Sequence, residues 1–115
     1  MGSGGVSGTV VQGTLDMLVL KAISLEPMHG WGIGDRIRRM SGDAFKVNAG
    51  SLYLSLERLQ QRGWVSSAWK TTENNRRARY YRLTRSGERR LVAEQAEWRR
   101  AAAGIEQMLS AVVPA

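Results

Sequence analysis

The chain has 115 residues, of which 43% are hydrophobic and 23% charged, a composition that indicates one globular domain and excludes wholesale disorder, collagen-like repeats and two full-sized domains. It contains no cysteine, which excludes disulfides, thiolate metal sites and cysteine nucleophiles, and no apolar run approaches the roughly 20 residues that cross a bilayer. The net charge of +7 is uneven, because residues 1–57 carry five basic and five acidic side chains, whereas residues 58–100 carry twelve basic and four acidic ones.

This charge distribution indicates a class of partner. Arginine outnumbers lysine fourteen to three, and the guanidinium group matches phosphate oxygens with paired hydrogen bonds. A partner that presents phosphates is therefore favoured over the alternative, a merely solubilising surface. The start, MGSGGVSG, lacks the pattern of a signal peptide, so we expect residues 1–10 to be disordered or cloning-derived. The absence of cysteine favours a cytoplasmic protein. We expect neither a cofactor nor a membrane segment.

Two helices are predicted in the first third of the chain. Apolar residues recur at helical spacing over residues 11–25 and indicate a largely buried first helix, which Pro27 ends. A second helix is predicted over residues 30–40, with isoleucines at core spacing. His29 precedes it without a cluster of histidines or acids at metal spacing, so we expect a turn or capping role for it and no metal site.

A third helix and two strands follow. Asn48 is a suitable N-cap for a helix that runs to about residue 62, and the spacing of its leucines by four and three marks the buried side. Residues 64–70 and 78–84 are rich in Trp, Val, Tyr and Thr and are separated by the polar segment TTENNRR, which predicts two antiparallel strands. Tyr81 is expected on the strand face opposite Tyr80.

Thr84 is expected to cap a long last helix that runs to about residue 112. An apolar seam with heptad spacing follows the helix, and a helix of ~40 Å is too long for a small domain to cover, so homodimerisation is predicted. Packing of part of the seam against the first helix is the alternative. The predicted dimerisation residues are Leu91, Trp98, Ala102, Ile105, Leu109 and Val112.

The order of elements predicts a mainly α fold with a small β wing. Three short helices followed by a two-stranded ribbon form a winged helix-turn-helix, in which the third helix enters the major groove of DNA and the wing contacts the backbone or minor groove. We assign residues 11–84 to the DNA-binding domain and residues 85–115 to the dimerisation helix.

Several segments resemble one family. They are GTLDMLVLKAI, HGWGI at residues 29–33, GSLYLSLERLQQRGWV at 50–65, RRARYYRLT at 76–84 and the SGERRL that follows. In this order they are similar to the PadR-type transcriptional regulators, in particular to short members with one C-terminal dimerisation helix. Leu54 departs from the pattern, because the family usually has proline there. The resemblance implies a homodimeric DNA-binding repressor that a small aromatic or lipophilic effector releases.

Candidate DNA contacts lie on the third helix and in the wing. Residues off the leucine stripe point outward and offer hydroxyl groups or charge to phosphates and base edges, and arginines in a protruding turn follow phosphates or enter a narrow minor groove. The candidates are Lys46, Ser51, Tyr53, Ser55 and Arg58 around the helix, and Lys70, Arg76, Arg77 and Arg79 in the wing. Ser55 is the weaker choice, and partial burial is the alternative for Tyr53.

Trp98 has two interpretations. It is a packing residue of the dimer seam, and the resemblance places it where a tryptophan of related regulators lines an aromatic pore that binds ligand between the subunits. Trp31 and Trp64 are expected to be core or dimer contacts.

The sequence therefore predicts a regulator that binds double-stranded DNA at a pseudo-palindromic operator. No nucleophile, base and orienting group occur together, so an enzyme is not expected. The alternative function is a dimeric scaffold that binds RNA or an acidic protein through its basic face.

Overall fold

The computed structural model describes residues 9–114, which form four helices and one antiparallel sheet. The elements in chain order are α1 (Thr9–Leu25), β1 (Met28–His29), α2 (Gly30–Met40), α3 (Ala49–Gln61), β2 (Val65–Thr71), β3 (Arg77–Leu83) and α4 (Arg85–Ser110). This is the predicted mainly α, winged-helix order. Of the N-terminal segment predicted to lie outside the fold, residues 1–8 fall outside the described part of the chain, and α1 begins at Thr9.

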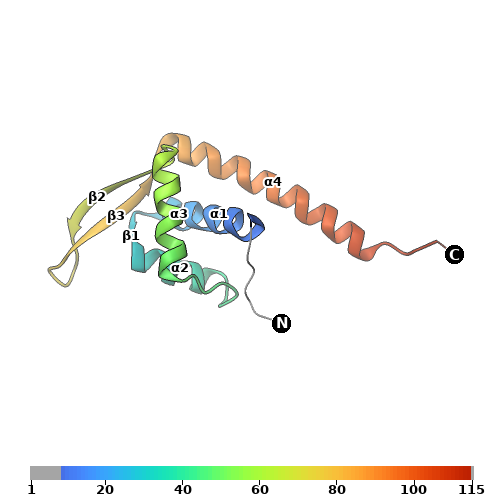
Figure 1. Cartoon of the computed structure of the whole chain (residues 1–115), viewed down its shortest axis with the longest axis horizontal. Coiled ribbons are helices and arrows are strands. Elements are labelled where there is room, and N and C mark those ends of the chain that lie inside the picture. Colours follow the sequence, from blue (N-terminus) through green and yellow to red (C-terminus); the bar gives the residue numbers. More distant parts are fainter. Residues whose placement is uncertain (1–8, 115) are drawn as a thin grey trace.

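The molecule has an elongated shape. In Figure 1 the hairpin of β2 and β3, which we call the wing, projects at one end, and α4 runs away from the three short helices toward the other end. The Cα radius of gyration is 16.4 Å, against about 13 Å for a compact domain of this length. Among residues 9–114 no helix combines the length and hydrophobicity needed to span a bilayer.

One hydrophobic core joins all four helices to the sheet. The predicted leucine stripe of α3 lies buried at the centre of this core. Apolar residues of α1 and α2 pack against the stripe, as their helical spacing predicts. The core residues are Val19, Leu20, Ala22, Ile23, Ile33, Ile37, Leu52, Leu56, Leu59, Val65, Tyr81 and Leu91. Because this core is assembled around α3, the opposite side of that helix is left to the solvent.

The sheet has three strands in the order β1-β3-β2. The wing strands pair over their full length, with Val65 opposite Leu83 and Trp69 opposite Arg79, which places Tyr81 and Tyr80 on opposite faces as predicted. Strand β1 was not predicted. It has two residues, too few for the alternation of polar and apolar side chains that marks a strand, and it forms because it pairs with β3.

Side chains cap three of the helices as the sequence predicts. The Nδ1 of His29 accepts a hydrogen bond from the backbone N–H of Gly32 at 3.0 Å and so caps α2. Asn48 caps α3 and Thr84 caps α4 in the same way. Each cap satisfies a backbone donor that has no partner within its own helix.

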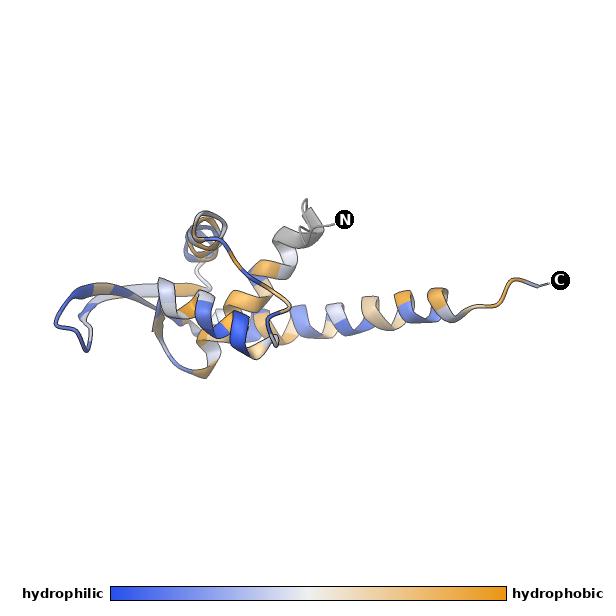
Figure 2. Cartoon of the chain, turned by 90° about the horizontal axis from the view of Figure 1, so that it is seen from below, coloured by the Kyte–Doolittle hydropathy of each residue, from blue (hydrophilic) through white to orange (hydrophobic). Residues whose placement is uncertain are grey.

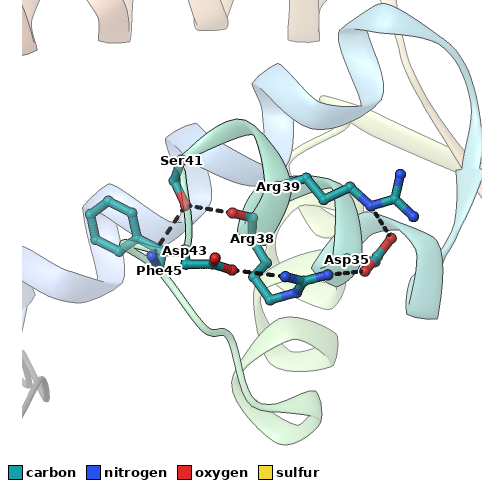
Figure 3. A network of polar contacts seen from close by, with 6 residues as sticks. All are labelled: Asp35, Arg38, Arg39, Ser41, Asp43 and Phe45. Carbon is teal, nitrogen blue, oxygen red and sulfur yellow. Dashed lines mark hydrogen bonds and ion pairs between the residues drawn. The ribbon is translucent and has the colours of Figure 1, made fainter.

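A polar network closes the connection between α2 and α3. Figure 3 shows its members, Asp35, Arg38, Arg39, Ser41, Asp43 and Phe45. The Arg38 guanidinium contacts Asp43 at 2.7 Å and Asp35 at 2.9 Å, and the bond from Arg38 is the main reason that the pKa of Asp35 lies below its ordinary value. Gly42 and Asp43 both have positive φ, so the chain turns sharply here and then enters α3.

Helix α4 is shorter than predicted. It ends at Ser110, and the extended residue Ala111 follows as its C-cap, so Val112 lies beyond the helix. Its first turns pack on the core through Leu91, whose exposed fraction is 7%. Leu91 is therefore not a dimerisation residue, and at this point of the seam the alternative of packing within the chain is confirmed.

Candidate nucleic-acid interface

Helix α3 presents a polar face away from the core. Ser51 and Tyr53 are exposed, as their positions off the leucine stripe predict, and Lys46 is exposed in the loop before the helix. The same face includes Leu54, Glu57 and Gln61, which we did not select from the sequence although their spacing by three and four residues defines the side opposite the leucines.

The prediction that Ser55 faces DNA is wrong, whereas Arg58 is partly exposed and its contact with DNA stays a prediction. Ser55 is fully buried, and its hydroxyl donates to a carboxylate oxygen of Asp16 in α1 at 2.6 Å. The guanidinium of Arg58 bonds to the same carboxylate at 2.7 Å, so its charge is balanced within the protein. Both residues therefore hold α3 against α1.

Tyr53 has one side on the protein and the other in solvent. Its exposed fraction is 48%, and its ring lies over Gly30, where an added Cβ would come within 2.6 Å of the Tyr53 Cζ atom. Burial, and secondarily the neighbouring Tyr53, raise the pKa of the Tyr81 phenol in β3. Tyr53 thus lies at the junction of α3, α2 and the sheet. It is both exposed, as predicted, and partly buried, as the alternative expected.

The wing carries the predicted cations on its surface. The side chains of Lys70, Arg76, Arg77 and Arg79 are exposed. Figure 2 shows that the far end of the hairpin is hydrophilic. The turn between the strands is closed by the Thr72 N–H, which donates to the Arg76 carbonyl at 2.6 Å, and by Asn75 at φ 60°. The Asn-Asn pair of the sequence therefore supplies the turn, as predicted.

The wing cations are free of ion pairs in the described chain, as are Arg62, Arg82 and several arginines of α4, whereas the arginines of α2 are paired. Within residues 9–114 the ion pairs belong to Arg36, Arg38, Arg39, Arg58 and Arg90, all of which lie in helices. No carboxylate of the described chain lies within 4.0 Å of a wing cation. The wing therefore has a net positive charge next to the exposed face of α3, with Glu73 in its turn as the single acid of the hairpin.

The tryptophans have different surroundings. Trp64 packs against the core, as expected. Trp31 is 75% exposed and stacks on His29 at the start of α2, so it is not a core residue, and its dimer contact stays a prediction. Trp69 lies on the wing beside Arg77 and Arg79 and was not selected from the sequence. The signal that indicates it is the alternation of the two strands, which sets Trp69 opposite Arg79.

The distal half of α4 exposes apolar side chains. Trp98, Ile105 and Leu109 are 52%, 59% and 77% exposed, and apolar bands are visible along this half of the helix in Figure 2. Ala102 is partly buried. The large apolar side chains of the seam beyond Leu91 are thus more than half exposed in the described chain.

A small cavity lies where α4 leaves the core. It has a volume of about 180 Å³ and is lined by Gly13, Asp16, Leu20, Leu59, Arg62, Trp64, Arg90 and Glu94. Pockets for drug-sized ligands usually have volumes of ~300 Å³ or more, so this cavity is too small for such a ligand. Within residues 9–114 no group of three His, Cys, Asp or Glu side chains is placed to hold a metal ion.

Known proteins share both the sequence pattern and this geometry. Residues 19–93 match the model of the transcriptional regulator PadR-like family. The crystal structure of a PadR family transcriptional regulator from Eggerthella lenta is 28% identical and superimposes with a TM-score of 0.75 over 90% of this chain and 88% of that chain. A PadR-like regulator from Bacillus cereus shares the fold at 23% identity, with a TM-score of 0.78 over 91% of this chain and all of that one. An uncharacterised protein of Lysinibacillus sphaericus is 24% identical over 93 residues, which are 81% of this chain and 85% of that protein.

Proposed function

Because this chain belongs to the PadR-like family of transcriptional regulators, and is thus a DNA-binding regulator and not an enzyme, we propose that it is a homodimeric, ligand-responsive repressor that acts in the cytoplasm on a pseudo-palindromic operator. The observation that carries the DNA-binding mode is the set of wing cations without carboxylate partners beside the exposed face of α3. Uncompensated arginines on a protruding hairpin favour a polyanion, because each phosphate they neutralise releases a counterion.

We assign α3 to the major groove and the wing to the flanking backbone or minor groove. Ser51 and Tyr53 offer hydroxyl groups for phosphate or base edges, and Lys46 offers a charge at the start of α3. Of the residues that the structure adds, Leu54 fits contact with a thymine methyl group, and Glu57 fits acceptance from the amino group of cytosine. With few base-reading groups on α3, half-site spacing and DNA shape contribute much of the specificity.

Replacing Arg76 and Arg77 together with alanine is expected to weaken binding to every DNA sequence by a similar factor. The slope of log affinity against log salt should become shallower by about 0.9 for each phosphate that the variant no longer neutralises. Fluorescence anisotropy with operator and scrambled duplexes at several salt concentrations measures both quantities. Arg36→Ala is the matched control, because Arg36 is already paired with Glu26 on the helical body. An unchanged slope in the double variant would contradict the assignment of the wing.

The same assay separates the two classes of partner that the sequence left open. Duplex DNA from the region upstream of the protein's own gene should bind more tightly than scrambled duplex or single-stranded RNA of equal length. Equal affinity for all three would instead favour a scaffold that binds RNA or acidic proteins, because counterion release alone does not distinguish sequences.

We propose that α4 forms the dimer through the exposed part of the seam, namely Trp98, Ala102, Ile105 and Leu109. Val112, beyond the helix end, contributes at most a flanking contact. Ile105→Asp places a charge in this seam and should shift the mass in sedimentation equilibrium from two chains to one at micromolar concentration. Glu106→Asp, on the neighbouring position, is the control that should remain dimeric. A monomeric unmodified protein would contradict the dimer.

We assign the effector site to Trp98, because its ring is half exposed on the seam and the resemblance to related regulators places it where a tryptophan lines a ligand-binding pore between the subunits. Titration with a planar aromatic cation should quench tryptophan fluorescence and lower affinity for the operator, as expected of a ligand that releases a repressor. Trp98→Ala should lose this quenching, whereas Trp31→Ala should keep it. Identical quenching in Trp98→Ala and in the unmodified protein would exclude this site.

A further inference from the structure

Three side chains meet on one face of the wing. Trp69 lies opposite Arg79 in the register of β2 and β3. Arg77 precedes Arg79 by two residues in β3, so the two arginines lie on the same face of the strand. The guanidinium carbons of Arg77 and Arg79 are 5.4 and 5.5 Å from the centre of the Trp69 ring. These distances are within the range of cation–π attraction, so one indole ring contacts both arginines.

The two arginines form a pair of like charges without a compensating acid. No carboxylate of the described chain lies within 4.0 Å of either guanidinium. The electron-rich ring face attracts both cations and so opposes their mutual repulsion. A neighbouring phosphate would complete the arrangement by neutralising the pair.

Arg79 is also connected by hydrogen bonds to α3, the proposed recognition helix. Its Nε–H donates to the Ser67 hydroxyl at 2.9 Å, and the same oxygen accepts from the Gln60 side chain of α3 at 3.2 Å. This bond uses one edge of the guanidinium and leaves its two terminal nitrogens as donors for another group. The chain of contacts from Gln60 through Ser67 to Arg79 fixes the position of Arg79 relative to α3.

We propose that Trp69 is the positioning residue of the wing, whose indole ring holds Arg77 and Arg79 side by side so that the pair is ready to bind adjacent DNA phosphates. The inference rests on the proposed DNA-binding function and adds a role for a residue outside the predicted contacts. Ordering a long side chain at an interface has an entropic cost, which is smaller when the protein already holds it in place. Arg76, in the turn beside this group, has no aromatic contact in the described chain and is the internal comparison.

The first test measures DNA binding by four variants. Trp69→Ala should weaken affinity about fivefold, an ordering effect of the usual size, while the salt slope stays unchanged because no cation is removed. Trp69→Phe should restore most of the affinity, since a phenyl ring also attracts cations. The Arg77→Ala/Arg79→Ala variant should bind DNA more weakly, and its affinity should depend less steeply on salt concentration. Adding Trp69→Ala to this variant should have no further effect. If Trp69→Ala weakens binding equally with and without the arginines, the ring acts on DNA directly and the positioning role is refuted.

The second test needs no DNA. In the free protein, the Nε–H group of Arg77 should show restricted motion by ¹⁵N relaxation and should become mobile in Trp69→Ala, while Arg76 is mobile in both. The Nε–H of Arg79 should stay restricted in both proteins, because it donates to the Ser67 hydroxyl. Equal mobility of Arg76 and Arg77 in the unmodified protein would overturn the proposal. If the arginines are held but Arg77→Ala/Arg79→Ala binds DNA normally, the DNA-binding role of the wing fails and the positioning effect stands. Trp69 is 55% exposed, so the thermal midpoint of its variants should match that of the unmodified protein.

Discussion

Gly87→Ala is expected to destabilise the protein by about 3 kcal/mol, at the upper end of the usual cost of overpacking. Gly87 is buried in the first turn of α4, where an added Cβ would overlap the carbonyl oxygen of Trp64 and lie 2.9 Å from its carbonyl carbon. The obstacle is backbone, which has no rotamer through which to move away. The start of α4 must therefore shift away from the beginning of β2.

Such a shift disrupts a compact junction. The Trp64 carbonyl accepts from the Thr84 N–H at 3.0 Å, and the Gly63 carbonyl accepts from the Thr84 hydroxyl at 2.6 Å and from the Ser86 hydroxyl at 3.0 Å. These bonds set the direction in which α4 leaves the core. Gly87→Ala should consequently weaken DNA binding as well as folding. The reason is that α4 carries the proposed dimer seam, and the direction of α4 sets the distance between the two wings of the dimer.

Gly104→Ala in the same helix is the matched control. A Cβ at Gly104 meets no atom within 4 Å, so this change should stabilise the protein by about 0.5–1 kcal/mol through helix propensity. Urea unfolding at equal protein concentration measures both variants, and equal concentration matters because association contributes to apparent stability. Equal stability of Gly87→Ala and Gly104→Ala would show that the junction adjusts without cost.

The fold was predictable where the signals are local. The caps at His29, Asn48 and Thr84 and the leucine stripe of α3 depend on residues within one or two helical turns of each other, and all were found at the predicted positions. The strand β1 was missed because its pairing with β3 is a contact over about fifty residues of sequence. A two-residue strand has no periodicity of its own to reveal it.

The candidate site was harder to predict, because exposure depends on distant partners. Ser55 follows Leu52 by three residues and so belongs to the buried side of α3, whereas the prediction places it off the leucine stripe and therefore outward. Its burial is explained by Asp16, which lies 39 residues earlier and supplies the acceptor. Leu91 similarly fits the heptad seam by spacing, and only the packing of α4 on the core assigns it to the interior of the chain.

Asp16→Ala is expected to lower the free energy of unfolding by about 2 kcal/mol and to weaken operator binding, although Asp16 is not an expected DNA contact. The change leaves the fully buried Ser55 hydroxyl without its acceptor and removes the carboxylate that balances Arg58. The hydrogen bond to Ser55 should account for most of the loss. The ion pair contributes less, because its side chains are 23% and 31% exposed and water screens their charges.

A double-mutant cycle separates this bond from the packing around it. Ser55→Ala alone should cost about 1 kcal/mol, and Asp16→Ala/Ser55→Ala should cost less than the sum of the single changes, because the orphaned hydroxyl is then gone. Glu26→Ala is the control for removing an exposed acid. The Glu26 side chain, which pairs with Arg36, is 66% exposed, so the free energy of unfolding should change by no more than ~0.5 kcal/mol. Additive costs for Asp16 and Ser55 would mean that the two residues stabilise the protein independently. A coupled cost accompanied by weaker operator binding would mean instead that this buried contact between α1 and α3 keeps the recognition helix aligned with the wing.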